Sequence, residues 1–255
     1  MSKEKWQATA KVLVIGYKQE SFFPFKLAVP FLQYVMDATI INSNHPSMIP
    51  TFLELVADSE KIVLETALNN FSDVDEEDLF DILDNYKVKR NATSDNIRAI
   101  LQDAAHRTLI QGTSYISRCW HSVFVEHLKP VLHTMNIEDI CQTAIPTTRR
   151  VIAALNLPQD ASEEQRNTTK LLLKFIKSLS VDKLMTFMRY TTGANQMLGK
   201  KITVRYVQQS DFERRPVAHT CGCILELASS FKDYIEFRSE FSAVLENNIW
   251  VMDIV

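Results

Sequence analysis

The sequence has little glycine, proline or cysteine. Its 255 residues include five glycines, eight prolines and four cysteines. Because glycine and proline interrupt regular structure, their scarcity predicts long helices joined by short turns. The cysteines, Cys119, Cys141, Cys221 and Cys223, are too few for a disulfide framework in a chain of this size. We therefore expect a reducing compartment, the cytoplasm or the nucleus.

Neither an excess of one charge nor a long apolar run is present. The formal net charge is -3, and acidic and basic residues are interspersed, which argues against a nucleic-acid-binding surface. No apolar run approaches the length of a membrane span, and residues 1–6 do not resemble a secretory signal. The composition, 46% hydrophobic and 23% charged, is that of an ordinary soluble protein with a substantial core.

Amphipathic helices are predicted for most of the first 140 residues. The acidic run at residues 73–78 indicates a helix start, because carboxylates there stabilise the exposed N–H groups. Ser94 is predicted to cap a helix that runs to about Ile110. Cys119 lies on the apolar stripe of the next helix, so we expect it in the core. Residues 12–15 fit either a strand or the end of a helix, and periodicity does not decide between them.

The helical pattern stops at residues 141–146, where we predict a short polar connection and the main internal boundary. Beyond it, Ser162 and Gln165 form a capping box at the start of a helix. A second helix is predicted to start at Ser180 and to stop at Gly193.

Strands are predicted only in the last third of the chain. Residues 201–207 alternate between apolar and polar, which is typical of a half-buried strand. Residues 217–218 and 224–225 are candidate extended segments beside it, and a last helix is predicted to start near Ser230. Together these patterns predict a mostly helical region followed by a small α+β unit.

A loop at residues 214–223 has the composition of a nucleophile loop, and Cys221 is its candidate nucleophile. A cysteine reacts as the thiolate, which exposure and neighbouring positive groups favour. Arg214, Arg215 and His219 supply such groups close in sequence. Pro216 biases the preceding residue toward an extended conformation, so we expect the chain to reach the loop extended.

Three other interpretations of the loop stay open. In an extended segment His219, Cys221 and Cys223 would point to one side, as metal ligands do, but no fourth ligand lies nearby in sequence. A disulfide between Cys221 and Cys223 would close a small, strained ring. In the third interpretation Cys221 is a small buried hydrophobic residue, which is the more common environment of a cysteine.

At this loop the sequence resembles the HECT family of ubiquitin ligases. The catalytic cysteine of that family lies in the pattern Leu-Pro-x-Ala/Ser-His-Thr-Cys-aromatic-Asn-x-Leu-x-Leu-Pro. The matching residues are Pro216, Ala218, His219, Thr220, Cys221, Leu225 and Leu227, and the departures are Arg215, Gly222, Cys223 and Ala228. Upstream, residues 187–193, Phe-Met-Arg-Tyr-Thr-Thr-Gly, resemble the family's Phe-Leu-x-Phe-x-Thr-Gly segment.

The resemblance implies an α+β fold with two lobes. Residues 1–141 resemble the later part of the family's larger, helical N-terminal lobe, residues 142–146 correspond to its hinge, and residues 147–255 resemble its catalytic C-terminal lobe. A complete HECT domain is longer than this chain, so we expect the first portion of the larger lobe to be missing.

The resemblance also implies a ubiquitin-protein transferase that needs no cofactor and no metal. Cys221 would accept ubiquitin as a thioester from a ubiquitin-conjugating enzyme and pass it to a lysine of a protein substrate. His219 and Thr220 would position the reacting groups, and Trp250 and Asp253 are the nearest equivalents of residues that support lysine attack near the family's C-terminus. The alternative is a catalytically incomplete HECT-like module that binds ubiquitin or a conjugating enzyme.

Overall fold

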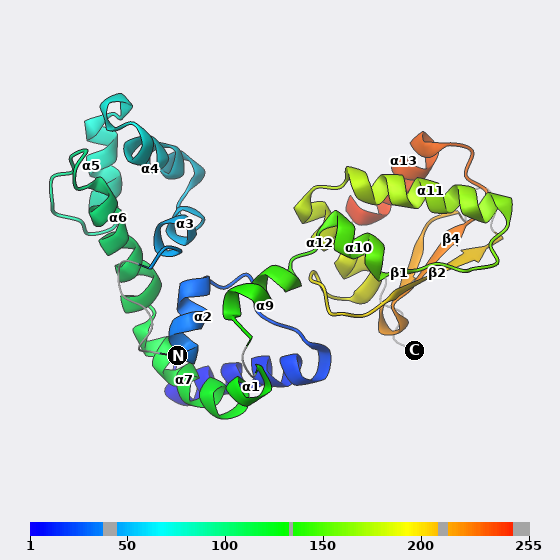
Figure 1. The fold of residues 1–255 in the computed structure, drawn as a ribbon, viewed down its shortest axis with the longest axis horizontal. Helices are drawn as coiled ribbons and strands as arrows, with labels where there is room; N and C mark the ends of the chain where they lie inside the picture. Colours follow the sequence, from blue (N-terminus) through cyan, green and yellow to red (C-terminus); the bar gives the residue numbers. More distant parts are fainter. Residues whose placement is uncertain (38–44, 133–134, 209–213, 247–255) are drawn as a thin grey trace. The chain divides into compact units, whose positions relative to one another are not determined.

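All described strands lie after residue 154, and the described residues before them form helices and turns. The computed structural model describes residues 1–37, 45–132, 135–208 and 214–246 (Figure 1). They fall into two compact units: Met1–Gln19 with Phe23–Cys141, and Glu20–Phe22 with Gln142–Val255. The predicted α+β class, a helical region followed by a small mixed sheet, is confirmed. Within the described ranges, no helix has both the length and the apolar character to cross a membrane.

One of the two cores of the first unit is built from its central helices. They are α3 (Met48–Leu53), α4 (Asp58–Asn69), α5 (Glu76–Asn85), α6 (Ile97–His106) and the π-helical turn η2 (Arg107–Gln111), with the short 3-10 helix η1 (Phe71–Asp73) after α4. The acidic run does start a helix. The Asp75 carboxylate accepts hydrogen bonds from the N–H groups of Glu77 and Asp78, both at 3.0 Å, and so caps α5.

The prediction of Ser94 as a helix cap is wrong, because α6 begins at Ile97. The Thr93 N–H donates to Oδ1 of Asn96 at 2.8 Å, and the Thr93 carbonyl accepts from the Ile97 N–H at 3.0 Å. These bonds close a turn over residues 94–96, and they use the side chain of Asn96 rather than a serine hydroxyl. A turn and a helix start share the same polar residue types, so composition alone misplaced the cap.

The second core of this unit combines helices from both ends of the region. It joins α1 (Lys3–Glu20) and α2 (Val29–Met36) to α7 (Ser114–His127), α8 (Lys129–Leu132) and α9 (Ile137–Ala144). Residues 12–15 lie inside α1 and are helical, which settles the open alternative. Pro30 lies in the first turn of α2, where its missing N–H costs no helical hydrogen bond. Cys119 is buried in this core, as predicted.

The predicted polar connection at residues 141–146, which includes the hinge expected at residues 142–146, is partly helical. Helix α9 continues to Ala144, so the helical pattern does not stop at Cys141, and only residues 145–147 separate it from α10 (Thr148–Ala154). A boundary between the two compact units nevertheless lies between Cys141 and Gln142. The Arg150 guanidinium donates to the carbonyls of Gln142 and Ile145, which ties the start of α10 to the end of α9. A hinge role for this segment stays a prediction.

The second unit contains a four-stranded sheet with the order β1-β2-β4-β3. Its strands are β1 (Leu155–Asn156), β2 (Ile202–Val207), β3 (Val217–His219) and β4 (Ile224–Ala228). β1 pairs with β2 and β2 with β4 in parallel, whereas β3 pairs with β4 antiparallel. Strand β1 was not predicted, because two residues are too short for a periodic signal.

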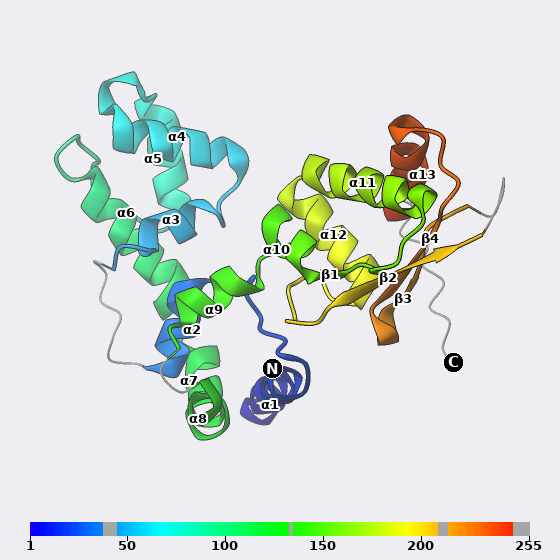
Figure 2. The same ribbon diagram turned by 45° about the vertical axis from the view of Figure 1, so that its right-hand side comes forward.

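Four helices accompany the sheet: α10, α11 (Glu163–Ser178), α12 (Val181–Thr192) and α13 (Tyr234–Glu246), with α11 and α12 side by side in Figure 2. The capping box of Ser162 with Gln165 and the cap from Ser180 are present as predicted. The last helix begins at Tyr234 rather than near Ser230, because the Asp233 carboxylate accepts from the N–H groups of Ile235 and Glu236.

Gly193 ends α12 in the left-handed conformation, with φ of +79°. A Cβ there would lie 3.6 Å from Cβ of Thr220, an ordinary contact, so the cost of Gly193→Ala is backbone strain rather than a clash. We expect Gly193→Ala to lower the free energy of unfolding of the second unit by about 1–2 kcal/mol, measured by hydrogen exchange of the amides of α11 and α12. Gly193→Asn is the control and should lose less stability, because asparagine tolerates the left-handed conformation. Equal losses for both variants would contradict the strain explanation.

Candidate functional site

Cys221 lies on a short turn between two strands of the sheet. Strand β3 leads into the 3-10 turn η4 (Thr220–Gly222), which contains Cys221, and β4 follows. The register pairs Val217 with Glu226 and His219 with Ile224. Leu225 and Leu227 of the cysteine pattern are fully buried, so they anchor β4 in the core beneath the turn. The cysteine is therefore carried by regular structure on both sides.

Cys223 is held by the backbone immediately after the turn. It has a left-handed conformation, with φ of +48°, and its N–H donates to the Thr220 carbonyl at 3.2 Å. Its carbonyl accepts from the Thr203 N–H of β2 at 2.8 Å. Its side chain is 5% exposed, and burial raises the pKa of the thiol. Cys223 is thus a buried structural residue.

Cys221, in contrast, is exposed, whereas the other three cysteines are buried. Burial, with the Glu138 charge as a smaller cause, raises the pKa of Cys141 to about 11. All four cysteines are free thiols. The hypothesis of a small buried hydrophobic residue therefore fits Cys223 and does not fit Cys221. Within the part of the chain that the structure describes, Cys221 is the one cysteine whose sulfur a large reactant can reach.

The alternative in which His219, Cys221 and Cys223 point to one side does not fit the structure. It assumed a continuous extended segment, but the turn at residues 220–222 interrupts the alternation of a strand. Among the described residues, no group of three or more histidine, cysteine or acidic side chains is arranged to hold a metal ion.

The His219 ring lies beside an acidic group that sequence analysis did not identify. Its Nε2 is 3.5 Å from Oε2 of Glu226, and both side chains are partly exposed. Glu226 faces Val217, two residues before His219, so the two side chains share one face of the antiparallel pair. Only the strand register could have revealed this pair. The carboxylate lies within ion-pair distance of the imidazole at the base of the cysteine turn.

Thr220 and the end of α12 shape the other side of the turn. The Thr220 carbonyl accepts from the N–H of Cys223, and its side chain faces Gly193. Three residues before this glycine, the Tyr190 hydroxyl donates to the Pro216 carbonyl at 2.5 Å. The two sequence motifs, separated by more than twenty residues, therefore meet in space at the cysteine. Catalytic roles for Cys221, His219 and Thr220 stay predictions. Trp250 and Asp253 lie outside the described residues.

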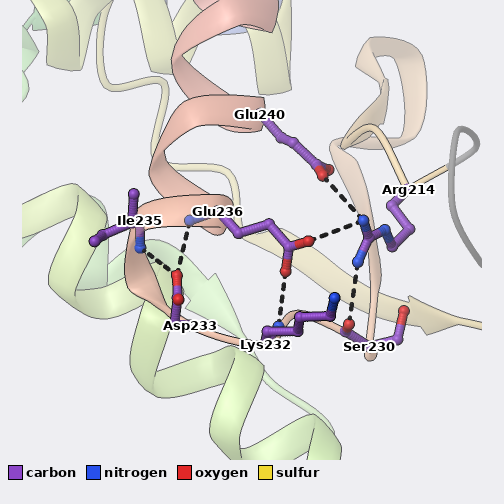
Figure 3. A network of polar contacts seen from close by, with 7 residues as sticks. All are labelled: Arg214, Ser230, Lys232, Asp233, Ile235, Glu236 and Glu240. Atoms are coloured by element: carbon purple, nitrogen blue, oxygen red, sulfur yellow. Dashed lines mark hydrogen bonds and ion pairs between the residues drawn. The ribbon is translucent and has the colours of Figure 1, made fainter.

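Arg214 ties the segment before β3 to the last helix (Figure 3). Its Nη2 lies 2.9 Å from Oε1 of Glu236 and 3.7 Å from Oε1 of Glu240, and its Nη1 donates to the Ser230 carbonyl at 3.4 Å. The three charged side chains are 17%, 23% and 25% exposed, in the order Arg214, Glu236, Glu240. Burial raises the pKa of Glu240, and the Arg214 charge acts in the opposite direction. The guanidinium thus compensates two half-buried carboxylates.

Replacing Arg214 by methionine tests this network. Arg214→Met keeps an apolar stem but removes the cation that pairs with Glu236 and Glu240. We expect the free energy of unfolding of the second unit, measured by hydrogen exchange of the amides of α11 and α12, to fall by about 1–2 kcal/mol, and the loss to shrink in high salt, because the side chains are partly solvated. Arg215→Met is the control: Arg215 is exposed and its charge acts on Glu240 less than that of Arg214, so this variant should lose no more than about 0.5 kcal/mol. Equal losses would mean that Arg214 contributes no more than a surface charge.

The fold and the site define a class of protein: a helical region followed by an α+β unit that presents one exposed cysteine on a turn between two strands. The comparison with known families agrees. The model of the family HECT-domain (ubiquitin-transferase) matches residues 8–248, and the chain belongs to this family. A comparison with curated protein sequences gave no significant match. Membership implies, for the class in general, ubiquitin, a ubiquitin-conjugating enzyme and protein substrates as partners.

Proposed function

We propose that this protein is a ubiquitin-protein transferase that accepts ubiquitin as a thioester on Cys221. The observation that carries the proposal is the exposure of this one thiol, on a turn held by the core, within the family's cysteine pattern. The other three cysteines are buried, so they are poor acceptors for a substrate of protein size. The cytoplasm or the nucleus stays our proposal for its location, from the small number of cysteines in the sequence.

In the first step, the Cys221 thiolate attacks the carbonyl of the thioester between ubiquitin and the conjugating enzyme. A new thioester forms on Cys221, and the enzyme's cysteine leaves as a thiolate. One thioester replaces another, so the step is nearly neutral in energy and depends mainly on how the two thiols are positioned.

In the second step, a neutral lysine amine of the substrate attacks the Cys221 thioester. An isopeptide bond forms, the amine loses its proton, and Cys221 leaves as a thiolate. Neither step needs a cofactor. His219, which lies beside Glu226, and the turn formed by Thr220 are the groups nearest in the chain that can orient the reacting carbonyl.

The proposal is tested by incubating the protein with activating enzyme, a panel of conjugating enzymes, ubiquitin and ATP. We expect a ubiquitin adduct that disappears when a reducing thiol is added. A stable complex with ubiquitin or a charged conjugating enzyme, formed without any adduct, would overturn the proposal and assign the protein to the binding-module alternative. Neither adduct nor complex with any member of the panel would also count against the transferase.

A further inference from the structure

Strand β3 lies at the end of the sheet order, so one of its edges has no strand neighbour among the described residues. It is short, Val217–His219, and it leads directly into the turn that carries Cys221. The backbone groups of a strand alternate between its two edges, so groups two residues apart face the same side. An edge with unsatisfied backbone groups is the least restrained part of a sheet. The position of Cys221 therefore depends on what restrains this edge.

The hydroxyl of Tyr190 occupies the place of a neighbouring strand. It donates to the carbonyl of Pro216 at 2.5 Å, and the backbone of Ala218 lies close enough to it to lower the pKa of the phenol. Pro216 and Ala218 are two residues apart, so their groups belong to the same edge of the strand. Burial raises the pKa of Tyr190 to about 12, and the Ala218 backbone acts in the opposite direction. The hydroxyl thus satisfies an acceptor of β3 and lies beside the backbone of Ala218 on the same edge.

The ring that carries this hydroxyl is fixed in the core of the unit. Tyr190 is 8% exposed, lies on α12 and makes an edge contact with Phe241, at 6.4 Å between ring centroids. The helix ends three residues later at Gly193, against Thr220 of the cysteine turn. In the segment that resembles the family's Phe-Leu-x-Phe-x-Thr-Gly, Tyr190 falls on the second phenylalanine, which has no hydroxyl. The link to β3 is thus a feature of this chain's own sequence.

We propose that Tyr190 is a positioning residue for the transfer reaction: its hydroxyl fixes the outer edge of β3 and thereby the Cys221 turn. The proposal rests on Cys221 as the ubiquitin acceptor. Tyr190 lies behind the turn and acts through the backbone of Pro216 and Ala218, not on the reacting atoms.

The test compares Tyr190→Phe with a matched control, Tyr206→Phe. The control also removes one hydrogen-bonded phenol oxygen from this unit, because the Tyr206 hydroxyl lies 2.5 Å from Oγ1 of Thr169, away from β3. Formation of the ubiquitin adduct is followed against the concentration of charged conjugating enzyme. We expect Tyr190→Phe to lower the maximal rate constant about tenfold, a factor typical of unsatisfied buried backbone groups, with the half-saturating concentration and the final amplitude unchanged. Tyr206→Phe should react like the wild type.

Each outcome of this comparison either supports or contradicts the proposal. A rate constant for Tyr190→Phe equal to that of Tyr206→Phe overturns the proposal. So does an unchanged rate constant with a smaller amplitude, because that result means a smaller folded fraction rather than a displaced turn. Failure of the wild type itself to form an adduct contradicts the acceptor role of Cys221, which is a different result.

A second measurement needs no activity, and its first part needs no variant. We expect the Ala218 amide of the wild type to be protected from hydrogen exchange as strongly as the amides of β4, although β3 is an edge strand. In Tyr190→Phe this amide should exchange about tenfold faster or more, while the amides of β2 keep their wild-type rates. Fast exchange of the Ala218 amide in the wild type would show that the hydroxyl does not hold this edge, and would overturn the proposal even if Tyr190→Phe did not fold.

Discussion

Cys221→Ala is expected to reduce the thiol-sensitive ubiquitin adduct to background, whereas Cys223→Ala keeps it. Alanine has no nucleophile, so no thioester can form at position 221. Cys223, only two residues away, is 5% exposed, and burial raises the pKa of its thiol, so it is both less accessible and less ionised. The measurement is a non-reducing gel of the charging reaction, with and without a reducing thiol, for the wild type and both variants.

Cys223→Ala is a demanding control, because it removes a thiol from the same turn. We expect it to cost about 1 kcal/mol in the free energy of unfolding, as for the loss of a small buried side chain, without abolishing the adduct. An adduct that survives Cys221→Ala and disappears in Cys223→Ala would show that the acceptor was assigned to the wrong sulfur. If both variants lose the adduct while circular dichroism shows that both are folded, adduct formation depends on the structure of the turn and not on one thiol alone.

The largest loss of stability is expected for Phe241→Ala, about 3–5 kcal/mol. Phe241 is completely buried, and its ring centroid lies 4.8 Å from that of Phe175 and 5.7 Å from those of Phe187 and Phe237. These rings come from α11, α12 and α13, so the cavity would open where three helices meet. Since whole domains are stable by only about 5–15 kcal/mol, the second unit of this variant should be close to unfolding.

Ile235→Ala on the same helix is the control for Phe241→Ala. Ile235 is 78% exposed, so its truncation should change stability by less than about 0.5 kcal/mol. The chain has two compact units, so a single unfolding curve does not report on one of them. Hydrogen exchange of the amides of α11 and α12 is the suitable measure. If these amides keep their protection in Phe241→Ala, the aromatic cluster is not the main source of stability of this unit.

The local chemistry of the sequence determined the starts of α5 and α11, both ends of α12 and strand β2. A serine followed three residues later by glutamine starts α11, Ser180 starts α12 and Gly193 ends it, because these side chains or backbones satisfy the unpaired groups of a helix end within one turn. Strand β2 followed from strict alternation. The motif at residues 187–193, followed by the cysteine pattern, predicted the family, and the match of the family model confirmed it. All of these signals act over a few residues or match a known pattern, so they can be recognised without a structure.

Local signals failed where neighbouring residues compete for the same role. Ser94 and Asn96 are both good caps, and the turn that Asn96 closes decided the start of α6. In the same way, Asp233 rather than Ser230 starts the last helix. At Cys141 the polar composition predicted a break, but α9 continues to Ala144.

The class of fold, the family pattern and the choice of Cys221 as a candidate could all be predicted without a structure. Only the tertiary structure distinguished Cys221 from Cys223, because exposure depends on the turn and on the strand pairing beneath it. It also brought Glu226 to His219 and Tyr190 to the edge of β3. Such contacts join residues that are distant in sequence, and their partners are set by the strand register and by helix packing, which no local pattern specifies.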